Sequence, residues 1–222
     1  VNIAVWETEI SPKLESAVKA VMTSSPDLQL SEVISVKSAE TQLEEILGAD
    51  GPSVELRNDV LELVDMFCCL FGLEKTGLRL ATLNRAMCPR FHVDHVPCRL
   101  LKTYKGIGTQ WIPHDFVDRT KLGVDRHNQP DELSGLFQSE TDIENLKINH
   151  IEAGRGVINH RQQSEAGNPR GISFPFEPRQ FIRHFCWRNK IFHHVVKAAT
   201  MHLPCLAMRL IRQFLAWLQT EI

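Results

Sequence analysis

The change in hydrophobic pattern at Gly77 constrains the fold more than any other feature of the chain. Before it, apolar residues across positions 56–71 recur every three or four residues, which is the period of one helix face. After it, positions 78–83 alternate as a strand does, and further short apolar runs follow between Gly and Pro turns. A helical first part followed by many short strands predicts an α+β protein whose helices cover a barrel or sandwich of strands.

The first fifty residues predict two strands and two helices. Residues 1–6 alternate weakly and residues 28–36 have strand character. A helix is expected over residues 12–22 because it opens with proline, which suits the first helical position. A shorter helix is expected over residues 40–47.

The helix over residues 56–71 has the clearest pattern in the chain. It follows a Gly-rich break that ends in Ser53, a suitable N-cap. Its apolar stripe is expected to cover one side of a sheet. Acidic side chains occupy much of the remaining surface and are expected to face solvent: Asp59, Glu62 and Asp65.

The part after Gly77 predicts several short strands and one long excursion. Strands are expected within residues 98–104, 106–112, 154–160 and 171–174. Residues 113–153 are polar and irregular, and such a long loop in a compact domain is often a lid or a binding loop.

The domain prediction separates a body from a basic tail. Residues 1–178 are expected to form one α+β domain, with a helical and mixed part over 1–76 and a strand-rich core over 77–178. Residues 179–222 contain seven Lys or Arg and one acidic residue, a net charge of +6 against −2 for the whole chain. An amphipathic helix is expected at the end of this tail, which otherwise folds weakly or not at all.

Charge and cysteine content restrict the partners and the compartment. A net charge of −2 gives no general attraction to nucleic acid or to an anionic membrane, so neither is expected as a partner. The longest apolar run, over residues 66–71, is far too short to span a bilayer. The six cysteines form no CxxC pair, and Cys68 and Cys69 are expected to be buried thiols. With no secretory pattern at the start, a reducing, cytoplasmic location is expected.

A His-x-Asp pair precedes the strand predicted over residues 98–104. In an extended segment residues i and i+2 point to the same face, so His92 and Asp94 are able to share one metal ion. His160 follows a second strand-like run and is the natural third ligand. Two imidazoles and one carboxylate form the triad that holds Fe(II) in non-haem oxygenases, with open positions for substrates.

This pattern is similar to that of the Fe(II)/2-oxoglutarate oxygenases, whose ligands lie on facing strands of a double-stranded β-helix. The resemblance implies a jelly-roll or cupin-like core with N-terminal helices packed against it. Arg170 is expected to hold the far carboxylate of 2-oxoglutarate, because a guanidinium pairs with a carboxylate through two hydrogen bonds. Tyr104 and Thr109 are expected to line the pocket. Three other arginines are alternatives: Arg99, Arg155 and Arg161.

Other interpretations of the pair stay open. A His-x-Asp pair occurs often by chance, and with ten histidines in the chain some histidine follows any such pair. Cys88 and Cys98 flank it, and both are candidate zinc ligands. A third possibility is a structural or interaction module in which the pair merely forms hydrogen bonds with the adjacent loop.

A longer motif around the pair points to one family. Residues 88–94 read Cys-Pro-Arg-Phe-His-Val-Asp, and residues 96–111 read Val-Pro-x-Arg-Leu-Leu-x-Thr-Tyr-x-Gly-x-Gly-Thr-x-Trp. With the opening residues 1–6 and the Gly-rich, His-Arg segment over 154–161, the chain resembles a bacterial family catalogued as domain of unknown function 1826. The likeness covers roughly residues 1–172, and the basic tail has no counterpart in it.

The resemblance implies that His92, Asp94 and His160 are important, and it carries no established reaction. Its members are discussed alongside zinc-responsive genes, which implies a link to metal homeostasis. The leading hypothesis is therefore an oxygenase that uses Fe(II) and 2-oxoglutarate on an unknown small-molecule or protein substrate. The alternative is a non-catalytic metal-binding protein linked to zinc homeostasis.

Overall fold

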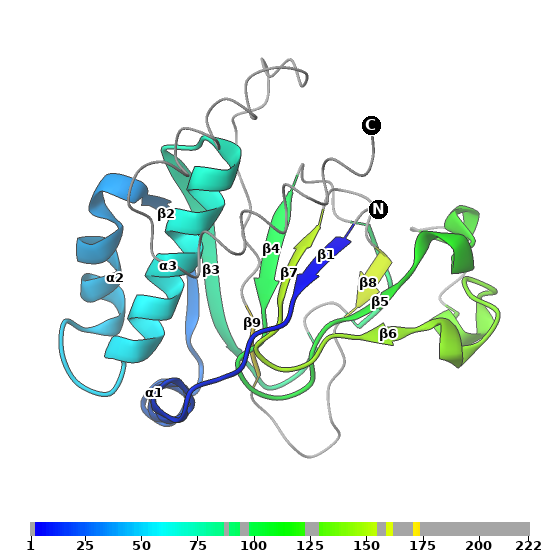
Figure 1. Ribbon diagram of the computed structural model, residues 1–222. Coiled ribbons are helices and arrows are strands. Elements are labelled where there is room, and N and C mark those ends of the chain that lie inside the picture. Colours follow the sequence, from blue (N-terminus) through cyan, green and yellow to red (C-terminus); the bar gives the residue numbers. More distant parts are fainter. Residues whose placement is uncertain are drawn as a thin grey trace.

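In the part of the chain that the structure describes, three α-helices combine with small antiparallel sheets (Figure 1), and the predicted α+β class is confirmed. The computed structural model describes residues 3–86, 89–93, 98–122, 129–154, 159–161 and 171–173. The tail over 179–222, with its expected helix, lies outside these residues. The helices gather on one side. The sheet of β1 (Ile3–Trp6), β7 (Ile151–Gly154) and β4 (Arg99–Lys102) lies beside them, and β5 (Gln110–Ile112), β6 (Glu144–Asn145) and β8 (Asn159–Arg161) lie farthest away.

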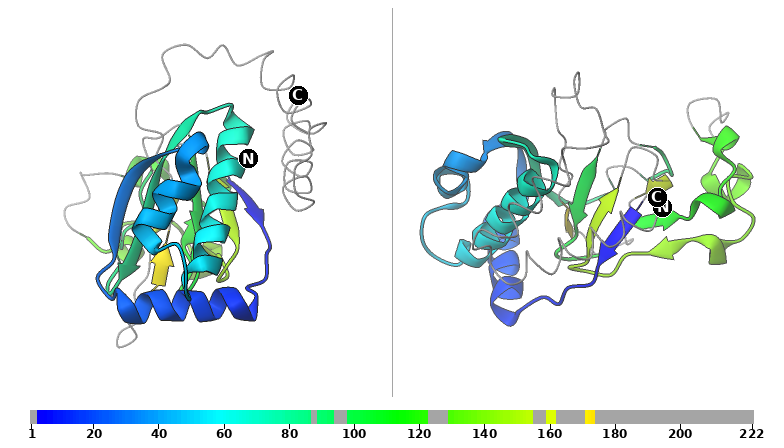
Figure 2. Two further views of the ribbon diagram at one scale, coloured as in Figure 1. Left: turned by 90° about the vertical axis from the view of Figure 1, so that its left-hand side faces the viewer. Right: turned by 45° about the horizontal axis from the view of Figure 1, so that its top comes forward.

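Three α-helices form the first layer. They are α1 (Pro12–Ser24), α2 (Ala39–Leu47) and α3 (Val54–Phe71). Both α1 and α2 pack on α3, and α1 runs crosswise beneath the other two (Figure 2). The N-cap of α1 is Ser11, whose side chain accepts the backbone N–H of Leu14 at 3.1 Å. Within the described residues, no helix has the length and apolar character needed to cross a membrane.

Ser53 occupies the N-cap position of α3, as predicted, but its side chain makes no capping hydrogen bond to the helix. Ser53 has a helical backbone conformation, and its Oγ donates to the carbonyl of Leu47 at 2.5 Å. Nearby, the Arg57 guanidinium donates to the carbonyls of Gly48 and Ala49 at 2.7 and 2.6 Å. The two side chains therefore satisfy carbonyl groups at the end of α2 and just beyond it, groups that a helix C-terminus leaves without partners.

The C-terminus of α3 ends on a glycine. Gly72 has a φ of +63°, and the N–H of Leu73 donates to the carbonyl of Cys68 at 2.8 Å. This left-handed ending suits glycine, which has no Cβ to clash. Cys68 is buried and Cys69 half-buried, and burial raises the pKa of the Cys68 thiol to about 12. The prediction of buried thiols is thus confirmed for Cys68 and in part for Cys69.

One three-stranded sheet lies against the helices. Its order is β2–β3–β9, and both pairs are antiparallel. The strands are β2 (Gln29–Ser35), β3 (Lys75–Leu83) and β9 (Gly171–Ser173). Here the predicted strands at 28–36, 78–83 and 171–174 are confirmed, and β9 joins β3 although the two are far apart in sequence.

Two further antiparallel sheets complete the described fold. One has the order β1–β7–β4 and contains β1 (Ile3–Trp6), β7 (Ile151–Gly154) and β4 (Arg99–Lys102). The other has the order β6–β5–β8 and contains β6 (Glu144–Asn145), β5 (Gln110–Ile112) and β8 (Asn159–Arg161). Short 3₁₀ turns lie between the elements: Val36–Ser38, His114–Phe116, Arg119–Lys121, Asp131–Leu133 and Glu140–Asp142.

The excursion over residues 113–153 has more structure than its polar sequence predicts. It contains β6 and nearly all of β7, and β7 is the middle strand of its sheet. Glu152 lies in β7 and is buried, so the strand carries a charged residue where an apolar one is expected. Because Glu152 breaks the apolar pattern, hydrophobic periodicity does not predict this strand.

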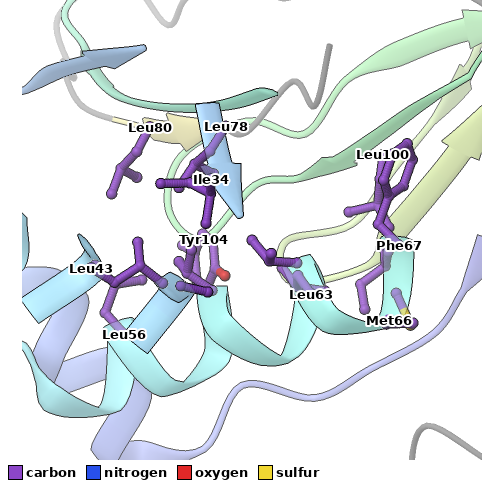
Figure 3. Packing of buried hydrophobic residues seen from close by; sticks show 14 of the residues in the cluster. Ile34, Leu43, Leu56, Leu63, Met66, Phe67, Leu78, Leu80, Leu100 and Tyr104 are labelled. Atoms are coloured by element: carbon purple, nitrogen blue, oxygen red, sulfur yellow. The ribbon is translucent and has the colours of Figure 1, made fainter. Parts of the chain in front are cut away.

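The main core forms where α3 meets the strands. Leu56, Leu63 and Phe67 project from α3, and they pack with Leu78 of β3 and Leu100 of β4 (Figure 3). All five are almost fully buried. Full burial of one such side chain contributes about 1.5–3 kcal/mol, so this apolar stripe dominates the stability of the helical layer.

A second, smaller core lies under the excursion. Phe91, Ile112 and Leu136 form its buried centre, and partly buried apolar residues from the excursion surround them. Phe91 directly precedes His92, so the packing of this core fixes the backbone next to the His-x-Asp pair.

Gly108 shows why the motif needs a glycine between β4 and β5. A Cβ at this position would lie 1.9 Å from the carbonyl oxygen of Leu146. The N–H of Leu146 in turn donates to the carbonyl of Thr109 at 2.9 Å. The two backbone segments therefore approach as closely as only glycine permits.

Candidate functional site

His92 lies half-buried between the buried ring of Phe91 and residue 93. Its Nδ1 is 2.9 Å from the carbonyl oxygen of Arg90. A carbonyl only accepts hydrogen bonds, so Nδ1 carries a proton, and Nε2 is the nitrogen whose lone pair a metal ion would use. Metal-binding histidines are typically oriented in this way, with the other ring nitrogen donating to a carbonyl or carboxylate.

The backbone next to His92 is held by a buried carboxylate. The N–H of Phe91 donates to Oδ2 of Asp131 at 2.8 Å, and Asp131 is 3% exposed. The ring of Phe91 meets the edge of the Phe137 ring, with centroids 6.0 Å apart. Both contacts bind the segment that contains His92 to the excursion.

Arg161 of β8 forms the centre of a buried polar network. Its Nε donates to Oε1 of Gln110 at 2.9 Å and its Nη1 to Oε1 of Glu132 at 2.7 Å. The same Nη1 is 3.5 Å from Oδ2 of Asp131. The guanidinium carbon lies 4.5 Å from the centroid of the Phe91 ring, a cation–π contact. The hydrogen bond from Arg161 lowers the pKa of Glu132, whose side chain reaches solvent.

The network brings two of the predicted ligand positions into one region. Phe91 and Arg161 are in contact, His92 directly follows Phe91, and His160 directly precedes Arg161. His160 lies in β8 opposite Trp111, as Arg161 lies opposite Gln110. Asp94 lies outside the described residues. Within the residues described, no group of three or more His, Cys, Asp or Glu side chains is placed to hold a metal ion, so the triad stays a prediction.

Tyr104 and Thr109, the predicted pocket residues, are both buried. The hydroxyl of Tyr104 donates to Oδ2 of Asp59 on α3. Burial and the neighbouring Asp59 carboxylate raise the pKa of Tyr104 well above its usual value. The backbone of Thr109 bonds to Leu146, as described above. Their role in lining a pocket stays a prediction.

The sequence did not reveal the partner of Tyr104. Lys102, 3% exposed, donates to both carboxylate oxygens of Asp59 at 2.7 and 2.8 Å. Its Nζ also lies 4.9 Å from the centroid of the Tyr104 ring. Asp59 was expected to face solvent, but it joins α3 to β4 through this buried ion pair. An acidic residue on a helix surface does not indicate which distant residue it pairs with, so the sequence does not predict this contact.

The alternative cosubstrate arginines differ in what surrounds them. Arg161 is engaged by Gln110, Asp131 and Glu132, so its charge is already balanced inside the protein. Arg170 and Arg155 lie outside the described residues, as does Cys88. Cys98, the other candidate zinc ligand, is a buried thiol immediately before β4.

Comparison with known proteins gives a family and no relative of established activity. No curated protein matches the chain. The family described as "Protein of unknown function (DUF1826)" matches residues 1–165, which is well over half of the 222 residues. The match includes the His-x-Asp pair, the Gly-rich segment before β5 and the His160–Arg161 dipeptide of β8. The chain therefore belongs to the DUF1826 family.

Proposed function

We propose that the protein binds a divalent metal ion through His92, Asp94 and His160. The observation that carries this proposal is the contact between Phe91 and Arg161, with 4.5 Å between the ring centroid and the guanidinium carbon. Each of these residues is the immediate chain neighbour of one of the two histidines. A metal site needs such proximity because its ligand bonds are only about 2 Å long.

The state of His92 also fits metal binding. With Nδ1 donating to the carbonyl of Arg90, the ring is oriented, and Nε2 is the nitrogen left to supply the electron pair that a metal ion requires. Two imidazoles and one carboxylate leave open positions on a six-coordinate ion. This donor set fits Fe(II) as well as zinc.

We propose that the metal serves a reaction of the Fe(II)/2-oxoglutarate oxygenase type on an unknown substrate. Bound iron supplies the centre at which dioxygen and the keto-acid react. His92, Asp94 and His160 hold the ion, and Arg170 binds the distant carboxylate of 2-oxoglutarate. A double-stranded β-helix arrangement of the strands and a cytoplasmic location belong to the same proposal. The antiparallel pairing of all strands in the described residues supports the former.

Metal analysis of protein purified without oxygen tests the metal site. The wild type is expected to retain about one equivalent of metal, and His92→Ala to lose it while its circular dichroism stays unchanged. His114→Ala serves as the control, because His114 is an exposed histidine in a 3₁₀ turn. Equal metal content in the wild type and His92→Ala would remove His92 from the site.

A non-catalytic zinc-binding protein is the second candidate. The buried thiol of Cys98 near the His-x-Asp pair favours it, because thiolates are preferred zinc ligands. Incubation with Fe(II), dioxygen and 2-oxoglutarate separates the two functions. Succinate formation that Arg170→Ala abolishes is expected for the oxygenase. Tight zinc binding with no affinity for 2-oxoglutarate would favour the second candidate.

A further inference from the structure

We propose that Asp131 and Arg161 are positioning residues of the metal site, which set the separation of the segments that contain His92 and His160. This inference rests on the proposed metal-binding function. It assigns a role to two residues that are not ligands themselves and that lie on different parts of the chain.

Asp131 controls the backbone on the His92 side. Its carboxylate accepts the N–H of Phe91 at 2.8 Å and also faces Nη1 of Arg161 at 3.5 Å. The side chain of Asp131 is 1% exposed, so water does not compete for either partner. Substitution of Asp131 therefore removes the hydrogen bond that holds the backbone N–H of Phe91, the residue before His92.

Arg161 holds Phe91 as well, through a contact with its ring. Its guanidinium covers the ring of Phe91 and is fixed in its plane by Gln110 and Glu132, at 2.9 and 2.7 Å. Gln110 lies opposite Arg161 in the β5–β8 pairing, so the arginine is tied to its own sheet. Phe91 is thus held by its backbone through Asp131 and by its ring through Arg161.

The geometry makes this network more than a source of stability. An intact buried ion pair contributes little net stability, because removing both charges from water offsets much of their attraction, whereas the loss of one partner destabilises the fold. Metal coordination, in contrast, depends strongly on small displacements, since ligand bonds tolerate only a few tenths of an ångström. Substitutions in a network that joins the neighbours of His92 and His160 are therefore expected to lower metal affinity as well as stability.

The chain offers a matched control in a second buried ion pair. Asp59 and Lys102 are bonded at 2.7 and 2.8 Å, and the Lys102 side chain is 3% exposed and that of Asp59 19%, against 1% for Asp131. This pair joins α3 to β4 and has no bond to Phe91 or Arg161. Asp59→Asn is expected to destabilise the protein without changing its affinity for metal.

The test is titration of the metal-free full chain with Co(II) in the absence of oxygen, followed by the visible absorption bands of the bound ion. Asp131→Asn and Arg161→Lys are expected to bind Co(II) about 10- to 100-fold more weakly than wild type, as substitutions of residues that orient ligands do. Their absorption bands are expected to shift. Asp59→Asn keeps the wild-type affinity and bands.

Glu132→Gln covers the case in which a buried substitution prevents folding. The Glu132 side chain is 43% exposed, so its replacement removes one bond to Arg161 with little effect on the core. It is expected to weaken Co(II) binding several-fold.

Three results would overturn the inference. Wild-type affinity and bands in Asp131→Asn, Arg161→Lys and Glu132→Gln, with binding lost in His92→Ala, would reject the positioning role and leave the metal site intact. Equal weakening in Asp59→Asn would assign the effect to general stability. No Co(II) binding by the wild type would reject the proposed function and this inference together.

Discussion

At the scale of single residues, two acidic side chains of α3 that the sequence predicts to be exposed are partly buried in the structure. Asp59 holds Lys102 and Tyr104 in the core, and Glu62 lies half-buried one turn further along. Burial raises the pKa of Glu62, and the negative charge of Asp59 raises it further. The folded protein therefore favours the protonated form of Glu62 more than the unfolded chain does.

This shift predicts a pH-dependent effect of Glu62→Gln. Below about pH 4, Glu62 is neutral in both states and the substitution changes the free energy of unfolding little. As the pH rises through the folded pKa, Glu62 ionises in an unfavourable, half-buried position. Its contribution to the free energy of unfolding of the wild type therefore falls. At pH 7 Glu62→Gln is expected to be more stable by less than about 1 kcal/mol, since solvent screens a half-buried group.

Urea unfolding of Glu62→Gln and of the wild type, at about pH 3.5 and about pH 7, measures this effect. The two pH values lie on opposite sides of the usual glutamate pKa. A stability difference that is the same at both pH values would contradict the assignment of the shift to Glu62.

At the scale of elements, hydrophobic periodicity predicts the parts of the chain where one face is apolar. The helices α1, α2 and α3 and the strands β2 and β3 follow their patterns to within a few residues. The strand β7 escapes prediction because Glu152 occupies a buried position in it. The Asp131–Arg161 network escapes for a related reason. Acidic residues in a polar loop are predicted to face solvent, because the sequence does not show that Arg161 contacts them in the fold.

The edge of β2 gives a prediction at this scale. Within the described residues β2 pairs on one side only, with β3. The amide of Gln42 in α2 accepts the N–H of Ser35 at 3.1 Å and donates to the carbonyl of Val33 at 3.4 Å. This side chain satisfies backbone groups that a neighbouring strand otherwise pairs, and edge strands are commonly protected from association by such coverage.

Gln42→Ala is expected to lower the free energy of unfolding by about 0.5–1.5 kcal/mol, the usual net contribution of a hydrogen bond. Glu45→Ala, an exposed position on the same helix, is the control for the change in helix propensity and is expected to have a smaller effect. Chemical unfolding measures both. An equal loss in the two variants would show that the amide does not stabilise the edge.

At the scale of the whole molecule, the sequence predicts the class and the family, and it leaves the pairing of distant strands open. The resemblance to family 1826 is confirmed over residues 1–165. The pairing of β1 with β7 and of β3 with β9 joins segments far apart in the chain, which local patterns do not encode. The meeting of the His92 and His160 segments also depends on such pairing, through β5 and β8 and the small core around Phe91.

X-ray absorption spectroscopy of the Co(II)-loaded protein tests the central claim most directly, because it counts the imidazole ligands of the bound ion. The wild type is expected to show two imidazoles with oxygen ligands in the remaining positions. His92→Ala and His160→Ala are each expected to lose one imidazole or the ion itself, and His114→Ala to match the wild type. A wild-type spectrum with fewer than two imidazoles would contradict the account.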